Sequence, residues 1–407
     1  MSKQFCATLL AACLSGGFFP LKIFSQWAPQ ADSIFGPYAG VQSLKAIDEN
    51  TAWASVGTNF IEGVPTVRPW IIRTTDGGTL WAYDTIPGTA GYEGGSISAL
   101  DADNCWATLD WTPNPAKRRV YHTSDGGQNW NLILEDRTAG GIVHFFDAQN
   151  GVVFNRNRYR YTTDGGANWS AENNLALPDS TAYLPLSGSY ATFGDTIWVT
   201  TVVQQLARST DKGKSWELTD LPFLGTDNFF ATITFFDGSH GMAASPYFSF
   251  PPKVWTTSDG GSTWTEVMPP QVVVDGLATL EAVEAIPGQL GWYLLQCSDF
   301  NVNTAQTYLT KDFGATWSLK DEQPAMVYAA TAVDFVSEKN GWAGLIYAPM
   351  LEAACVFRWD GLLGLKADVP QEDVYKTAQG QPHSAPPTLG FRKQKTVRAI
   401  RQNGHSH

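Results

Sequence analysis

Six aspartates recur in one short motif, and recurring carboxylates are candidates for an active site. In each copy a Ser or Thr stands two residues before the aspartate, a Gly two after it and a Trp five after it. The copies lie 39 to 53 residues apart and centre on Asp76, Asp125, Asp164, Asp211, Asp259 and Asp312. A motif present in every repeat does not mark one active site. We therefore expect these carboxylates to accept backbone N–H groups in tight turns.

Six basic residues stand at matching distances before the first three of these aspartates. Three precede an aspartate by eight residues, two by six, and the last follows closely. They are Arg68, Lys117, Arg119, Arg156, Arg158 and Arg160. A fixed offset in a repeat maps to one edge of the fold, so we expect these side chains to gather at the start of the third strand of three repeat units.

This basic cluster predicts a site for an acidic glycan or an acidic protein segment, held by charge-assisted hydrogen bonds. Aromatic side chains suited to stacking are expected on nearby loops, namely Trp111, Tyr247, Phe248, Phe250 and Tyr347. The alternative is that each arginine pairs with one of the abundant carboxylates.

The cysteines and histidines predict neither a metal site nor a cofactor. There is no Cys-x-x-Cys pattern and no His-x-x-x-His pair. Cys105 and Cys297 fall in apolar strands and are expected to be buried and reduced, although Cys297 and Cys355 could pair. His144 and His240 stand at or near predicted turns, where a polar surface role is expected.

A second repeat lies between the copies of the first and indicates the elements that carry them. It is an apolar run, a polar turn and then a large residue, centred on Trp53, Trp106, Val152, Trp198, Met242, Trp292 and Trp342. Two hairpins per unit give four strands, and seven such units predict an all-β, seven-bladed propeller of four-stranded antiparallel blades. The seventh unit ends in VFRWDG and lacks one strand, so we expect residues 26–30 to supply it and close the ring.

The two ends of the chain differ from the repeats, which form one predicted domain over residues 27–361. Residues 1–26 resemble a secretory leader, and Cys13 follows a lipoprotein-like Leu-Ala-Ala, so export is expected with a lipid anchor as an alternative. Residues 362–407 carry seven basic and three acidic residues and predict a disordered tail. Residues 27–361 contain 18 basic and 36 acidic residues, and this excess of negative charge disfavours nucleic-acid binding by the propeller.

The motif S/T-x-D-x-G-x-x-W resembles the Asp-box, or bacterial neuraminidase repeat, over nearly all of residues 27–361. The second repeat, with its copy at residues 334–344, is most similar to exported photosystem II assembly-factor-like propellers, and the leader resembles those of Bacteroidetes. The resemblance implies this fold and leaves activity open. Sialidases of the superfamily carry an Arg-Ile-Pro element before the first Asp-box, where this chain has Val67, Arg68 and Pro69.

We therefore predict a secreted, periplasmic or surface-exposed monomeric propeller that binds a protein, peptide or glycan and catalyses nothing. It is expected to need no cofactor and to have no membrane-spanning segment. The alternative is a sialidase-like glycoside hydrolase that uses paired carboxylates.

Overall fold

The computed structural model describes twelve segments of the chain. They are residues 27–30, 39–58, 69–110, 117–175, 189–201, 205–221, 231–245, 252–274, 278–299, 304–324, 330–345 and 356–359. The leader and the tail expected from the sequence lie outside them.

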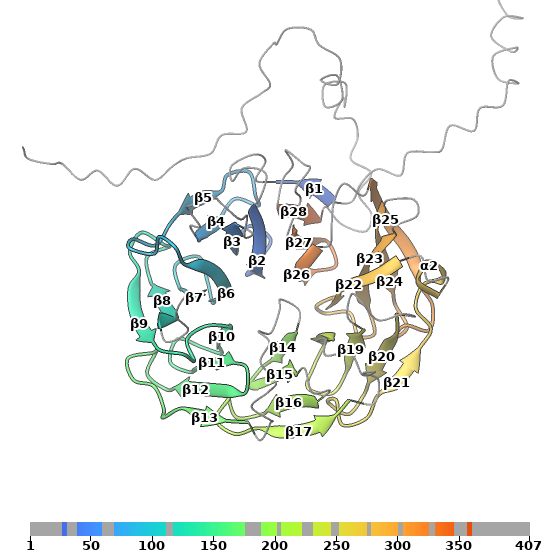
Figure 1. Ribbon diagram of the computed structural model, residues 1–407. Helices are drawn as coiled ribbons and strands as arrows, with labels where there is room; N and C mark the ends of the chain where they lie inside the picture. The colour runs from blue at the N-terminus through green and yellow to red at the C-terminus, as the bar shows by residue number, and fades with distance from the viewer. Residues whose placement is uncertain are drawn as a thin grey trace, which may run out of the picture.

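In the described part of the chain, the strands form seven four-stranded antiparallel sheets arranged as blades around a common axis (Figure 1). Blade 1 contains β2 (Ala39–Ala46), β3 (Ala52–Thr58), β4 (Trp70–Thr74) and β5 (Ala82–Asp84). Blade 2 contains β6 (Glu93–Ala99), β7 (Cys105–Asp110), β8 (Arg119–Thr123) and β9 (Asn131–Glu135). Blade 3 contains β10 (Ile142–Phe145), β11 (Gly151–Asn155), β12 (Arg158–Thr162) and β13 (Asn173–Asn174).

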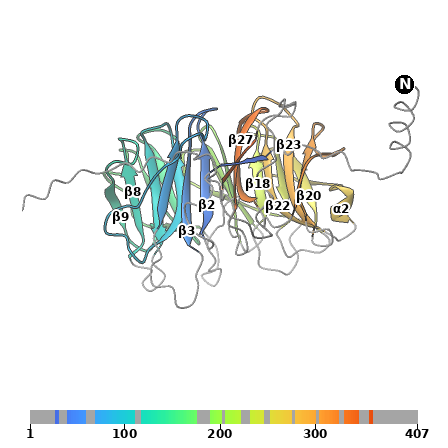
Figure 2. The ribbon, with the colours of Figure 1, turned by 90° about the horizontal axis from the view of Figure 1, so that it is seen from above.

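The other four blades repeat this plan, and a side view shows a flat disc (Figure 2). Blade 4 contains β14 (Tyr190–Phe193), β15 (Thr196–Thr200), β16 (Gln205–Ser209) and β17 (Glu217–Asp220). Blade 5 contains β18 (Thr232–Phe235), β19 (Gly241–Ala244), β20 (Val254–Thr257) and β21 (Thr265–Val267), followed by the short helix α2 (Gln271–Val274). Blade 6 contains β22 (Ala278–Ala285), β23 (Tyr293–Asp299), β24 (Thr304–Thr310) and β25 (Ser318–Pro324). The seven-bladed, all-β prediction is confirmed.

Blade 7 joins the two ends of the propeller. It contains β26 (Ala330–Ser337), β27 (Asn340–Leu345), β28 (Val356–Trp359) and, as its outer strand, β1 (Trp27–Pro29). Trp27 pairs with Trp359 in antiparallel register, and the Gln30 N–H donates to the Val356 carbonyl at 2.8 Å. The predicted closure by an N-terminal strand is confirmed, and it covers the edge that β28 would otherwise expose.

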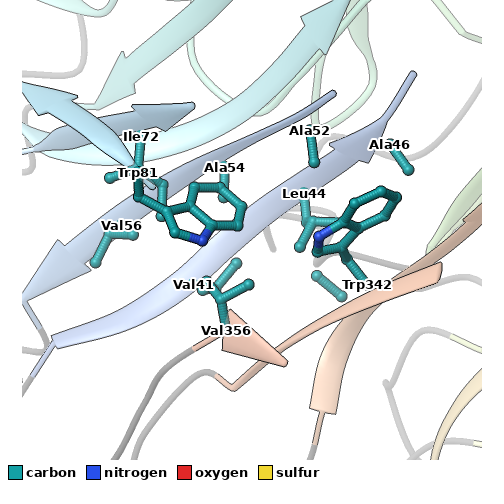
Figure 3. Close-up of a cluster of buried hydrophobic side chains, with 11 residues drawn as sticks. Val41, Leu44, Ala46, Ala52, Ala54, Val56, Ile72, Trp81, Trp342 and Val356 are labelled. Atoms are coloured by element: carbon teal, nitrogen blue, oxygen red, sulfur yellow. The ribbon is translucent and has the colours of Figure 1, made fainter. Parts of the chain in front are cut away.

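The hydrophobic core lies between neighbouring blades. The buried apolar side chains of the described residues fall into seven clusters, each shared by two adjacent blades. In the cluster between blades 7 and 1, Trp81 and Trp342 pack with Val41 and Val356 (Figure 3). The large residues of the second repeat are buried, except the half-buried Trp292. Among the tryptophans of the first repeat, Trp81 is buried and the other five are half-buried.

Arginines opposite the second-repeat tryptophans link one blade to the next. Arg73 is the cross-strand partner of Trp53, and Arg358 is that of Trp342. Each guanidinium lies over its indole ring, at 5.3 and 5.6 Å from the ring centroid. Each also donates to a backbone carbonyl of the following blade, that of Ala102 for Arg73 and that of Gly77 for Arg358. These contacts combine cation–π attraction with a charge-assisted hydrogen bond.

The motif aspartates lie in the turns between third and fourth strands, which we call the Asp turns. In blade 1 the Thr74 hydroxyl donates to Asp76 Oδ1 at 3.0 Å and accepts from the Gly78 N–H at 2.9 Å. Asp76 Oδ1 also accepts from the Leu80 N–H at 2.9 Å. Gly78 has a φ of 87°, a conformation that glycine adopts without strain. The carboxylate is thus engaged by its own turn.

Candidate functional site

The first strand of each blade lines the central channel, and seven polar side chains occupy one repeated position on these strands. We call them the channel ring: Lys45, Ser98, His144, Tyr190, Thr234, Glu284 and Asp334. An inner strand has no further strand beside it, so its N–H groups need other partners. The ring residues therefore stand where backbone groups and solvent meet.

Several ring side chains bond to the backbone of the next blade. The Ser98 hydroxyl accepts from the Phe145 N–H at 2.9 Å, and the Thr234 hydroxyl accepts from the Ala285 N–H at 3.0 Å. Asp334 Oδ2 accepts from the Ala46 N–H at 2.8 Å. These bonds fix the inner strands relative to one another and hold the ring in place.

An ion pair joins the first and last blades inside the channel. Lys45 Nζ lies 2.8 Å from Asp334 Oδ2, with side-chain exposures of 45% and 14% respectively. Although burial works against the charged ammonium, the attraction and the hydrogen bond of Asp334 raise the pKa of Lys45 above its usual value. Asp334 is consequently committed to Lys45 and to the Ala46 N–H.

Glu284 lies on the same cavity wall without an equivalent partner. Burial, followed by repulsion from Asp334, raises its pKa well above the usual value for a glutamate. The Thr234 hydroxyl donates to Glu284 Oε2 at 3.5 Å, which is long for a hydrogen bond. These surroundings therefore favour the protonated form of Glu284 more than water favours it for an exposed glutamate.

His144 is a neutral member of the ring. Burial first, and then the positive charge of Lys45, lower its pKa to about 3. Its ring contacts Phe146 edge-on at 4.6 Å between centroids. The polar surface role expected from the sequence is wrong for His144, because β10 continues through that position and directs it to the channel. His240 does lie in a turn, between β18 and β19, where it contacts Asp237.

These groups line a cavity of about 490 Å³ at one end of the channel. Six of the seven ring residues, all except Ser98, contribute to it, together with the last residues of inner strands, such as Phe193 and Phe235. The Asp turns belong to the same face of the disc, because the Gly77 N–H donates to the carbonyl of Asn50 in the β2–β3 turn at 2.9 Å. The cavity therefore opens on the face that carries the Asp turns.

Apolar side chains line this opening. Phe193 ends β14 and is 49% exposed, and Pro287 and Phe236 also line the cavity. Leu290, which is 52% exposed, lies in the same β22–β23 turn as Pro287. A polar floor beneath an apolar rim is the usual composition of a binding pocket.

The predicted basic cluster belongs to the opposite face, where second strands connect to third strands. Arg119 and Arg158 are the first residues of β8 and β12, and Arg156 occupies the β11–β12 turn with a φ of 61°. Lys117 is exposed just before β8, and Arg160 lies within β12. The structure thus brings these described members to the third strands of blades 2 and 3.

Carboxylates neutralise much of this cluster. Distances from the guanidinium Nε to the carboxylate are 2.5 Å for Arg119 with Glu135, 2.7 Å for Arg160 with Asp136, and 3.4 Å for Arg158 with Glu172. Arg137, which the sequence reasoning did not include, also pairs with Glu172 at 2.5 Å. The arrangement fits the alternative in which arginines pair with carboxylates. Binding of an anionic partner here stays a prediction.

Several predicted binding residues lie outside the described part of the chain. They are Arg68, Trp111, Tyr247, Phe248, Phe250 and Tyr347. Cys355 lies there too, while Cys105 and Cys297 are buried and free. Within the described residues, no three His, Cys, Asp or Glu side chains are grouped so as to hold a metal ion. None of the helices described there has the length and apolar character needed to cross a membrane.

The channel ring was not predicted from the sequence, although its residues stand at a fixed offset in the repeat. Each ring residue stands eight positions before the large residue of the second repeat, from Lys45 before Trp53 to Asp334 before Trp342. All seven residues at that offset are polar, within strands that are otherwise mainly apolar. This offset identifies the channel without coordinates.

Neither a known protein family nor a curated protein matches this sequence. Among solved structures, the chain is similar to YCF48 bound to D1 peptide, with a TM-score of 0.58 and 16% identity over 83% of this chain and 95% of that one. It is similar to YCF48 from Cyanidioschyzon merolae, with a TM-score of 0.54 and 14% identity over 82% and 99% of the two chains. It is also similar to the GH74 xyloglucanase from Xanthomonas campestris, with a TM-score of 0.53 and 14% identity over 83% of this chain and 56% of the enzyme. At these identities the likeness concerns the fold, which this chain shares with a peptide-bound propeller and with a glycosidase.

Proposed function

We propose that this chain is a non-catalytic binding propeller that recognises a protein or peptide segment at the mouth of its central channel. The observation that carries the proposal is the cavity of about 490 Å³, with its polar ring below and its exposed Phe193 above. Such a pocket takes an apolar side chain at the rim and a polar group inside. The similar fold of a YCF48 protein bound to a peptide supports this choice of partner.

Hydrolysis of a glycan is the second candidate, and Glu284 is the residue that favours it. A carboxyl group with a raised pKa suits a general acid, and glycosidases place a second, ionised carboxylate nearby as nucleophile or base. In this channel the neighbouring carboxylate is Asp334, which is held by Lys45 and the Ala46 N–H. A carboxylate with both contacts is poorly placed to attack, so binding is the better-supported function.

We also keep the proposal of a site for an anionic partner on the opposite face, limited to Arg156 and Arg158. Arg156 stands in the β11–β12 turn, and its buried Nε has no hydrogen-bond partner. If an acidic segment binds there, replacing Arg156 and Arg158 with Ala will weaken binding of a polyglutamate peptide and flatten its salt dependence. Equal binding by the variant and the wild-type protein assigns these arginines to structure alone.

Selection of peptides from a random library tests the proposed function. Immobilised wild-type protein is expected to enrich peptides that bind saturably in fluorescence anisotropy, and Phe193→Ser is expected to weaken them about tenfold by removing the exposed anchor. Leu132→Ser, at an exposed position on the outer strand β9, is the matched control.

A panel of fluorogenic aryl glycosides tests the alternative on the same samples. The proposal expects release of fluorophore no faster than from heat-denatured protein. Turnover that disappears in Glu284→Gln would contradict the proposal and establish a glycosidase.

A further inference from the structure

We infer that the channel cavity binds a cationic side chain of the partner segment, an arginine guanidinium or a lysine ammonium. This inference rests on the proposed function and specifies the chemistry of the group that enters the channel. It starts from the charges of the ring, which contains two carboxylates and one ammonium on a shared cavity wall.

The cavity already holds one cation. Lys45 Nζ contacts Asp334 at 2.8 Å, so this environment accepts an ammonium group beside a carboxylate. Glu284 faces the same pair, and its one hydrogen-bond contact among the described residues is the long one with Thr234. A second cation beside Glu284 would add a charge-assisted hydrogen bond to this carboxyl group.

The remaining walls suit a cation as well. Phe193, Phe236 and Tyr190 present aromatic rings around the cavity, and aromatic faces attract guanidinium and ammonium groups. Asp237 adds a further carboxylate at the rim. Residues 27–361 carry 18 basic and 36 acidic residues, so the field of the whole propeller also attracts cations.

The groups that face Glu284 predict how binding depends on pH. They are Lys45 on β2, Asp334 on β26, His144 on β10 and Tyr190 on β14. His144 is neutral above pH of about 3, so it does not repel the ligand in neutral solution. Because a cation favours the ionised form of Glu284, binding will release a proton and will strengthen as pH rises through the raised pKa of this carboxyl group.

Isothermal titration calorimetry with two matched peptides provides the test. The probes are Ac-Phe-Gly-Arg-Gly-Phe-NH₂ and the same peptide with citrulline, which keeps the shape of arginine without its charge. At pH 8 we expect the arginine peptide to bind at least about tenfold more tightly to the wild-type protein, as a charged hydrogen bond in a partly buried site implies. Buffers of different ionisation enthalpy will report the released proton.

Two variants assign the preference to Glu284. Glu284→Gln keeps the shape of the side chain and is expected to bind both peptides equally. Glu266→Gln, an exposed residue of β21 that pairs with Lys253, is the control and should retain the preference. Thermal unfolding of each variant verifies that it is folded.

Three outcomes would overturn the inference. They are equal affinity of the wild-type protein for both peptides, a preference that survives in Glu284→Gln, and no binding of the arginine peptide at millimolar concentration. If library-selected peptides still bind through Phe193 in any of these cases, the proposed function stands and only the cationic specificity fails. If the library yields no binder either, both fail.

Discussion

At the scale of the residue, two sets of carboxylates behave in opposite ways. In the Asp turns, hydrogen bonds from neighbouring groups stabilise the ionised form, and the pKa of Asp164 is lowered first by the Asn168 side chain and then by its N–H. In the channel, burial and a like charge stabilise the protonated form of Glu284. Sequence position alone distinguishes these roles poorly, because both are acidic residues at a fixed place in a repeat.

Asp211 provides a test of the Asp turns. Its Oδ1 accepts from the Ser209 hydroxyl at 2.8 Å and from the Ser215 N–H at 2.9 Å, so Asp211→Ala leaves turn donors without a partner. We expect the free energy of unfolding to fall by about 1 kcal/mol, as for loss of a capping side chain. Asp211→Asn, which keeps one acceptor oxygen, should lose less. Urea unfolding measures the free energy of unfolding of both variants. An unchanged value for Asp211→Ala would show that solvent replaces the capping carboxylate.

His144 predicts a pH dependence of stability. Its folded pKa of about 3 lies below the unfolded value of about 6.5, so its contribution is complete above pH 6.5 and is lost as pH falls below it. Between pH 7.5 and 5 this loss amounts to about 2 kcal/mol. His144→Gln should remove that part of the slope, while the part due to half-buried His122 remains. Equal slopes for both proteins in urea unfolding would show that His144 titrates normally.

At the scale of the element, the critical strand is β1, three residues that close a seven-bladed ring. Trp27 is buried, its Nε1 donates to Thr307 at 3.0 Å, and its ring contacts Phe335 and Trp359 edge-on. β1 therefore connects blade 7 to blade 6 as well as to β28.

Replacing Trp27 with Ala is expected to lower the free energy of unfolding by about 3–5 kcal/mol, the range for loss of a large buried aromatic side chain. Leu132→Ala, on the exposed outer strand β9, should change it by less than about 0.5 kcal/mol. Comparable losses in both variants would mean that the closing strand has no special role.

The elements also show which features of the fold could be predicted from the sequence. Blade number, strand order and ring closure followed from the period of two motifs and a missing strand, because turn chemistry and buried tryptophans are local signals. The channel ring could not be predicted in the same way, because its residues share only their polarity and their offset from the second repeat. They are of different types and come from seven segments that lie far apart in the sequence. Partners such as Asp334 for Lys45, 289 positions away, are set by ring closure and have no local sequence signal.

For the basic cluster, the offset in the sequence groups the arginines but does not identify their carboxylate partners. Arg119 and Arg158 are the first residues of β8 and β12, but their partners Glu135 and Glu172 come after the next turn of each blade and lie outside the offset. A count of charges along the chain does not reveal which carboxylates a fold delivers to each guanidinium.

At the scale of the whole molecule, the propeller is a disc with two chemically different faces. One face carries the Asp turns, the exposed Phe193 and the channel mouth, and the other carries the paired arginines of blades 2 and 3. The described propeller is built from inter-blade clusters, so a partner can dock on it without large rearrangement.

Export is the remaining prediction at this scale. Expression of the full chain in a Gram-negative host is expected to give a secreted or periplasmic product that begins near Gln26 or Trp27, because residues 1–26 resemble a leader. Mass spectrometry of the purified product determines its first residue. A product that begins at a lipid-modified Cys13 would favour the surface anchor, and a full-length cytoplasmic product would contradict export.

Photo-crosslinking tests the central claim, that a peptide binds at the channel mouth, most directly. A library-selected peptide carrying a benzophenone is irradiated with the wild-type protein, and the attachment points are mapped by mass spectrometry. We predict crosslinks to Phe193, Phe236 and the turn that contains Leu290, and their loss in Phe193→Ser. Crosslinks confined to the opposite face near Arg156, or unchanged crosslinks in Phe193→Ser, would contradict the account.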